Sequence, residues 1–141
     1  MPTYTLLCPP HATSPHIARD FVATVLRALR LDELVEDATL CTSELVTNAC
    51  VHAKGDGAAL WLAVEGERLR VVVYDGDERP PVTKGLTPDT WERGGRGLYL
   101  VDALTYGRWG HAPDLPYDGL VHPEGKAVWF DLPVRHPGSH E

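Results

Sequence analysis

The chain has 141 residues, of which 43% are hydrophobic and 23% are charged. It is long enough for a single domain, residues 1–141, with its own core, and its apolar runs are shorter than the roughly 18 residues of a membrane span. The net charge of -7 disfavours a nucleic-acid-binding protein, because phosphate binding requires clustered Lys and Arg. No secretory signal is visible, so we expect a cytoplasmic protein that binds proteins or small molecules, not membranes.

The first half of the chain contains patterns typical of one strand and two helices. A short strand is expected at 4–7, before a Pro-Pro break. Ser14, followed by proline, is typical of a helix N-cap, and apolar residues at helical spacing continue this helix to about Arg30. A second helix is predicted at about 33–53, with Asp32 as its cap.

The next segments indicate a hairpin and a long loop. Apolar and β-branched runs at 58–65 and 69–75 are joined by a short turn that contains glycine, which is typical of a β-hairpin. Residues 76–95 are rich in Pro, Gly, Thr and charge and have no periodic pattern. Loops of this length inside a compact domain are often functional, so we expect a lid here.

The last third of the chain supplies the remaining elements. We expect a short helix at 96–105, a further strand at 107–111, a final strand at 126–132 and a frayed tail at 133–141. Because two helices precede most of the strands, the order favours an α+β fold. We predict a two-layer sandwich with the helices on one face of a mixed, mainly antiparallel sheet.

The three cysteines are Cys8, Cys41 and Cys50, an odd number without the C-x-x-C spacing of zinc-binding motifs. We therefore expect buried, reduced thiols. A metal hydrolase site that uses Glu44 and His52 is a further alternative, but the spacing differs from H-E-x-x-H and no further ligand set is evident.

Three polar residues, Glu44, Asn48 and His52, are spaced four apart on the second predicted helix. Such residues lie along one face, and a carboxylate and an amide one turn apart can serve one site together. The alternative for Glu44 is a solvated carboxylate. A lone histidine near a helix end more often caps, packs or faces water, so His52 is a supporting candidate only.

Two further motifs lie downstream. Asp75 ends an apolar strand, where a carboxylate can accept a hydrogen bond from an exocyclic amine such as that of adenine, although Asp-Gly is most often a turn. The segment Gly94–Leu98 opens a helix, where glycines let the backbone approach a phosphate and free N–H groups are available. A glycine-rich hinge is the alternative, and the segment matches neither a Walker loop nor the dinucleotide motif.

In this order the motifs resemble those of the GHKL, or Bergerat-fold, ATPase superfamily. The matching segments are the N box at Glu44–Asn48, the first glycine box at Asp75–Asp77 and the second at Gly95–Val101. The small size and the phrases at 43–49 and 97–102 look most like the serine/threonine kinases that act as bacterial anti-sigma factors.

The resemblance implies ATP and Mg²⁺ as cofactors. It implies that Asn48 ligates Mg²⁺ through its side-chain oxygen, that Asp75 reads the adenine amine, and that Glu44 is the general base for an attacking hydroxyl. The second glycine box would bind the nucleotide through Gly95, Arg96, Gly97 and Leu98. For Arg96, the alternative to neutralising phosphate charge is a role in lid solubility.

The resemblance also implies protein partners. These are a sigma factor, which the protein would sequester, and an anti-anti-sigma antagonist, which it would phosphorylate; the relatives suggest a homodimer. The alternative is a non-catalytic module that regulates a partner by binding alone. Two departures favour it, because Asp77 stands where a glycine is common and Ala127 where many members have a threonine near the adenine.

Overall fold

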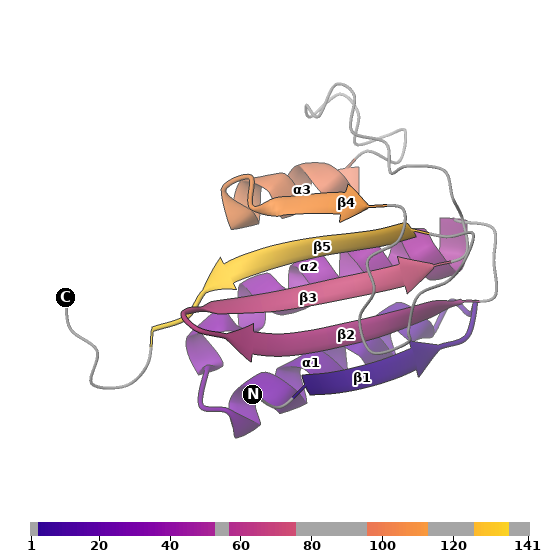
Figure 1. Ribbon diagram of the computed structural model, residues 1–141. Coiled ribbons are helices and arrows are strands. Elements are labelled where there is room, and N and C mark those ends of the chain that lie inside the picture. The colour runs from indigo at the N-terminus through magenta and orange to yellow at the C-terminus, as the bar shows by residue number, and fades with distance from the viewer. Residues whose placement is uncertain (1–2, 53–56, 76–95, 113–125, 136–141) are drawn as a thin grey trace.

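The structure, a computed structural model, describes residues 3–52, 57–75, 96–112 and 126–135 (Figure 1). Its helices and strands follow in the order β1 (Thr3–Cys8), α1 (Ser14–Ala28), η1 (Asp32–Leu34), α2 (Val35–Thr47), η2 (Asn48–His52), β2 (Ala58–Glu65), β3 (Arg68–Asp75), α3 (Arg96–Thr105), β4 (Trp109–Ala112) and β5 (Lys126–Pro133). All predicted strands are present, and the predicted helices are present except that the second is divided into three parts. The predicted lid at 76–95 and most of the predicted tail lie outside the described residues.

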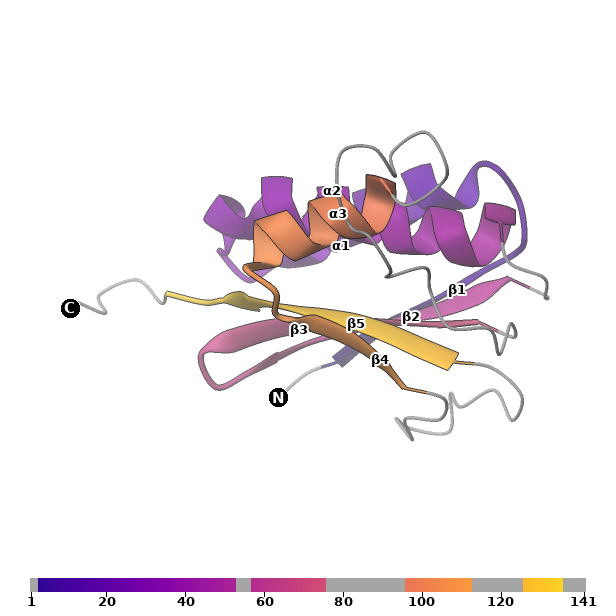
Figure 2. The ribbon, with the colours of Figure 1, turned by 90° about the horizontal axis from the view of Figure 1, so that it is seen from above.

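The strands form one sheet in the order β1-β2-β3-β5-β4. All four neighbouring pairs in this described sheet are antiparallel, and we expected a mixed, mainly antiparallel sheet. The three α-helices cover one face of the sheet, as the view along the layers in Figure 2 shows. The predicted two-layer α+β sandwich is therefore confirmed. No helix in the described part of the chain is both long and apolar enough to cross a membrane.

The β2–β3 hairpin forms where the sequence predicts it. Glu65 pairs with Arg68, so the loop consists of Gly66 and Glu67 alone. Gly66 has a φ of 64°, a left-handed conformation that costs a side-chain-bearing residue energy and glycine almost none. The glycine thus allows a two-residue turn between two long strands.

The start of α1 differs from the prediction by one residue. Thr13 is the N-cap, and Ser14 is the first helical residue. The Ser14 hydroxyl donates a hydrogen bond to the carbonyl oxygen of Pro9 at 2.7 Å instead of capping the helix. The helix ends at Ala28, and Arg30 takes a positive φ of 61°, which turns the chain toward η1.

The second predicted helix is not continuous. It comprises the 3₁₀ turn η1, the α-helix α2 and the π-helical turn η2. Spacing of apolar residues does not separate these forms over three to five residues, which explains the wrong prediction of one regular helix. The change to π-helical geometry falls at Asn48, the second residue of the predicted motif.

The core lies between the sheet and the helices. Its largest fully buried side chains include Leu26, Val46, Leu60, Leu62, Val71, Val73, Leu98, Val101 and Phe130. A smaller cluster covers the outer face of the sheet and is formed by Trp61, Ala63, Val72, Tyr74 and Ala127. Because side chains alternate along a strand, this division assigns each residue of β3 and β5 to one face.

Candidate functional site

Several predicted site segments converge on one end of the molecule. The end of α2 with η2, the end of β3, the start of β5 and the start of α3 all lie toward the right in Figure 1, and the second view agrees (Figure 2). η2 also contacts β3, and α2 packs against α3. The fold therefore brings the described parts of all three sequence motifs to one region.

Glu44 lies on α2 and Asn48 one turn later, at the junction with η2. Both residues are half-buried. The Asn48 N–H bonds to the Glu44 carbonyl oxygen, so the two side chains still leave the helix one α-turn apart. A half-buried carboxylate and amide can both face a ligand while keeping some access to water.

His52 is the last residue of η2, and its side chain lies outside the described residues. In a π-helical turn the bonds run from i to i+5, so a spacing of four no longer stacks side chains as it does in an α-helix. The predicted alignment of His52 with Glu44 and Asn48 assumed a regular α-helix, and it stays a prediction.

Asp75 is the last residue of β3 and is only 5% exposed. Every second side chain of a strand points to the same face, so Asp75 shares a face with Val71 and Val73. These two residues belong to the core under the helices, and Asp75 therefore faces the helix layer. The alternative of an Asp-Gly turn is not tested, because Gly76 lies outside the described residues. A buried carboxylate needs a charged or hydrogen-bonding partner.

The partner of Asp75 is Lys126, at the start of β5. The two residues are directly opposite each other in the β3–β5 register, and the Lys126 Nζ donates to both carboxylate oxygens at 3.1 Å. Sequence reasoning missed Lys126. The available signal was strand alternation, which places Lys126 with Val128 on the helix face.

The family resemblance places Ala127 near the adenine, but the structure places it on the other face of the sheet. It pairs with Tyr74 and belongs to the outer cluster, on the face of the sheet opposite to Asp75. The departure at Ala127 therefore does not bear on the candidate site, and the residue of β5 that does is Lys126. Asp77, the other departure, lies outside the described residues.

The second glycine box is described in part. Arg96 and Gly97 are the first two residues of α3, and Leu98 is 1% exposed in the core, while Gly95 lies outside the described residues. The first N–H groups of an α-helix have no partner within the helix, so the start of α3 offers donors to an anion. Leu98 anchors this helix instead of presenting its side chain to a ligand.

Asp102 fixes the other end of α3. Its carboxylate accepts a hydrogen bond from the Trp109 indole N–H at 2.9 Å, and its carbonyl accepts one from the Gly107 N–H at 2.9 Å. These bonds join α3 to β4 across a tight turn. The helix is therefore held at its C-terminal end while its N-terminal end points toward the candidate site.

The three cysteines are buried and reduced, as predicted. A hydrogen bond with Cys8 raises the pKa of Cys50, and burial and the negative charge of Asp75 raise it further. Burial, together with the charges of Asp37 and Glu44, raises the pKa of Cys41 to about 12. The hydrogen bond between Cys8 and Cys50 lowers the pKa of Cys8, so the fold disfavours ionisation of Cys41 and Cys50 only.

The donor set fits magnesium carried by a nucleotide. In the described ranges, no three His, Cys, Asp or Glu side chains are grouped to hold a metal. Nucleotide-bound Mg²⁺ usually takes one or two protein oxygens besides phosphates and water, and the Asn48 amide offers such an oxygen. The residues thus suit an ion that arrives with phosphates better than one held by protein alone.

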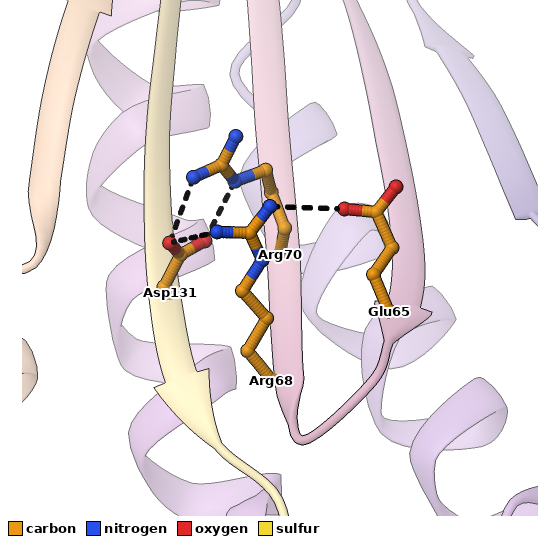
Figure 3. A network of polar contacts seen from close by, with 4 residues as sticks. All are labelled: Glu65, Arg68, Arg70 and Asp131. Carbon is orange, nitrogen blue, oxygen red and sulfur yellow. Dashed lines mark hydrogen bonds and ion pairs between the residues drawn. The ribbon is translucent and has the colours of Figure 1, made fainter.

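A second polar network lies on the outer face of the same two strands (Figure 3). Arg70 donates to Asp131 through Nε at 2.7 Å and through a terminal nitrogen at 2.8 Å, and it stacks over Trp129 at 4.4 Å. Arg68 lies between Asp131 and Glu65. The predicted motifs contribute none of these residues, and the network joins β3 to β5 near the hairpin end.

Known proteins resemble part of the chain. The model of the family described as histidine kinase-like ATPase domain matches residues 8–106. Serine-protein kinase RsbW of Bacillus subtilis (strain 168) is 33% identical over 84 aligned residues, which cover 50% of this chain and 52% of that protein. The chain thus spans about half the length of the curated relative that it matches. Since the family model covers more than half of the chain, the protein belongs to the histidine kinase-like ATPase domain family.

Proposed function

We propose that this protein is an ATP-dependent serine/threonine protein kinase that phosphorylates an antagonist protein and sequesters a sigma factor. The convergence of Glu44, Asn48 and Asp75 at one end of the sheet carries this proposal. The family match supports the use of ATP, and the similarity to a serine-protein kinase supports transfer to a protein. The cytoplasmic location, the single-domain organisation and the homodimer stay predictions.

Each residue has a defined task in this proposal. Asp75 accepts a hydrogen bond from the adenine amine, and the backbone at Gly95–Gly97 donates to the phosphates. Asn48 binds the metal through its amide oxygen, and Mg²⁺, when bound, neutralises phosphate charge and orients the γ-phosphoryl group. Arg96 can add a positive charge beside the phosphates.

Glu44 acts on the protein substrate. Its carboxylate accepts the proton of the attacking serine or threonine hydroxyl as that oxygen bonds to the γ-phosphorus. The bond between the γ-phosphorus and the bridging oxygen of ADP breaks in the same transfer. The products are the phosphorylated antagonist, ADP and a proton on Glu44.

The test is phosphotransfer from labelled ATP to an antagonist candidate encoded beside this gene. We expect transfer by the wild type and a loss of at least a hundredfold in Glu44→Gln, since general-base catalysis is typically worth 10²–10⁴. Glu36→Gln is a matched control, because Glu36 is an exposed carboxylate on the same helix. Equal transfer by wild type and Glu44→Gln would show that Glu44 is not the base.

A second candidate function is a module that regulates its partner by binding alone. One observation favours it: Lys126 already engages both oxygens of Asp75, the carboxylate proposed to read adenine. Calorimetry with Mg-ATP separates the two functions, since a kinase must bind the nucleotide. Heat of binding at micromolar to millimolar affinity supports the kinase, and its absence supports the binding module.

A further inference from the structure

The contact between Asp75 and Lys126 is not an ordinary surface ion pair. The two side chains are 4% and 10% exposed, and they lie on the helix face of the sheet. Removing two charges from water costs several kcal/mol per ion, and the attraction between them often fails to exceed that cost. Fold stability alone therefore gives a weak reason for a lysine at this position.

The position of the pair indicates a role in binding. Asp75 ends β3, which contacts η2, the turn that begins at Asn48. Lys126 begins β5 opposite Asp75. The ammonium group thus lies at the same end of the sheet as the candidate metal ligand and the candidate base-reading carboxylate.

The pair presents a donor beside an acceptor. The carboxylate oxygens of Asp75 accept hydrogen bonds, and the Lys126 ammonium donates them. The Watson–Crick edge of adenine carries the complementary order, with the 6-amino donor beside the N1 acceptor. A carboxylate can accept from several donors at once, so the lysine and the adenine amine do not exclude each other.

We propose that Lys126 is a specificity-determining residue that donates to N1 of adenine while Asp75 accepts from the 6-amino group. The proposal rests on the proposed nucleotide site and adds a second base-reading group to it. Lys126 also holds the carboxylate in place, because its Nζ contacts both oxygens equally.

The first experiment uses the full wild-type chain and two ligands. Calorimetry compares Mg-ADP with the Mg complex of 1-deaza-ADP, in which a C–H replaces N1 while the amine is kept. A hydrogen bond from a charged donor predicts that 1-deaza-ADP binds about tenfold to a hundredfold more weakly. Equal affinity overturns the role of Lys126 and leaves the proposed function standing. Absence of binding by both ligands overturns the proposed site and this inference together.

The second experiment uses the variant Lys126→Met, which removes the donor. We expect it to bind Mg-ADP more weakly than the wild type and to lose the preference for Mg-ADP over 1-deaza-ADP. A variant that keeps the wild-type preference overturns the proposal. If Lys126→Met fails to fold, Lys126→Gln, which keeps a shorter neutral donor, replaces it and is expected to show a reduced preference; an unchanged preference overturns the proposal.

The matched control is Arg70→Met, which breaks the cross-strand ion pair between Arg70 and Asp131. Arg68, which lies 3.6 Å from Asp131 in the wild type, still offers that carboxylate a partner, and the change lies on the outer face of the sheet. We expect the preference for Mg-ADP over 1-deaza-ADP to equal that of the wild type. A loss of preference here as large as in Lys126→Met would show a general effect of weakened strand pairing and would overturn the proposal. Tighter binding of Mg-GDP than Mg-ADP by the wild type would also contradict it.

Discussion

Strands β3 and β5 are joined by ion pairs on both faces of the sheet, toward opposite ends of the strands. On the outer face, Arg70 donates hydrogen bonds to Asp131 from two nitrogens at 2.7 and 2.8 Å, and it stacks on Trp129. On the helix face, the single Nζ of Lys126 lies 3.1 Å from each oxygen of Asp75. The guanidinium of Arg70 is planar and rigid and packs on an aromatic ring, whereas the ammonium of Lys126 is a compact charge at the end of a flexible side chain.

This difference separates a structural contact from a candidate binding contact. The arginine pair lies toward the β2–β3 hairpin (Figure 3). The lysine pair lies beside η2, where the predicted metal ligand is found. Two cross-strand pairs of the same kind can thus differ in role because of the face and the end of the sheet on which they lie.

The largest expected effect comes from Asp75→Ala. It leaves the buried Lys126 without its carboxylate, and breaking one half of a buried pair costs about 3–5 kcal/mol in the free energy of unfolding. We also expect Mg-ADP affinity to fall at least tenfold. Urea unfolding and calorimetry measure the two effects.

The double variant Asp75→Ala with Lys126→Met controls for that loss of stability. Since replacing a whole buried pair by apolar groups is often nearly neutral, we expect stability to recover while nucleotide binding stays weak. Recovery of both stability and binding would mean that Asp75 serves only the fold.

A smaller effect is expected from Asp131→Asn on the outer face. Hydrogen bonds to charged groups contribute about 1.5–3 kcal/mol, and the asparagine keeps part of the hydrogen bonding. We expect the free energy of unfolding to fall by about 1–2 kcal/mol with Mg-ADP affinity unchanged. A drop in affinity larger than threefold would remove the distinction between the two faces.

The burial of Cys41 beneath the helices can be tested by measuring the free energy of unfolding at several pH values. Its pKa is raised from 9.0 to about 12 in the fold, so between these values the unfolded chain loses the thiol proton and the native chain keeps it. The contribution of the protonated Cys41 thiol to the free energy of unfolding is present below pH 9 and is lost as the pH rises toward 12. At pH 10 the loss is about 1.4 kcal/mol relative to neutral pH.

The readout is the difference in stability between wild type and Cys41→Ala, measured by urea unfolding at pH 8 and pH 10. This difference cancels the other groups that titrate at alkaline pH. It should shrink by about 1.4 kcal/mol between the two conditions. A constant difference would mean that Cys41 titrates alike in the folded and unfolded chain.

The smallest effect is expected from Glu65→Gln. Glu65 contacts Arg68 at 3.3 Å with both side chains nearly half-exposed, and such surface pairs contribute about 0–1 kcal/mol. We expect a change in stability below about 0.5 kcal/mol and none in nucleotide binding. A larger loss of stability would mean that Glu65 also contributes to the stabilising network on the outer face.

Much of the fold could be predicted from local patterns. The hairpin follows from two β-branched runs around Gly66, and α1 follows from its apolar spacing with a proline in the first turn. The π-helical turn at Asn48 could not be predicted, because a change of hydrogen-bond pattern over five residues leaves the apolar spacing nearly unaltered. The predicted alignment of His52 with Glu44 and Asn48 stays a prediction, because the side chain of His52 lies outside the described residues.

The candidate site could be predicted in part. Glu44, Asn48 and Asp75 were found from motif spacing, and their roles stay predictions. The family pattern indicated Ala127 and not Lys126, which is one residue earlier. One step along a strand moves a side chain to the opposite face of the sheet, so the two residues lie on different faces.

The amino-acid sequence by itself determined the α+β class, the order of the elements and the family, because these depend on local periodicity and on short motifs. Only the tertiary structure decided that Lys126 lies against Asp75, 51 residues earlier in the chain. Alternation within a strand shows which residues share a face, but the register between two distant strands depends on how the whole sheet packs against its helices. That register is what places an ammonium group beside the carboxylate of the candidate nucleotide site.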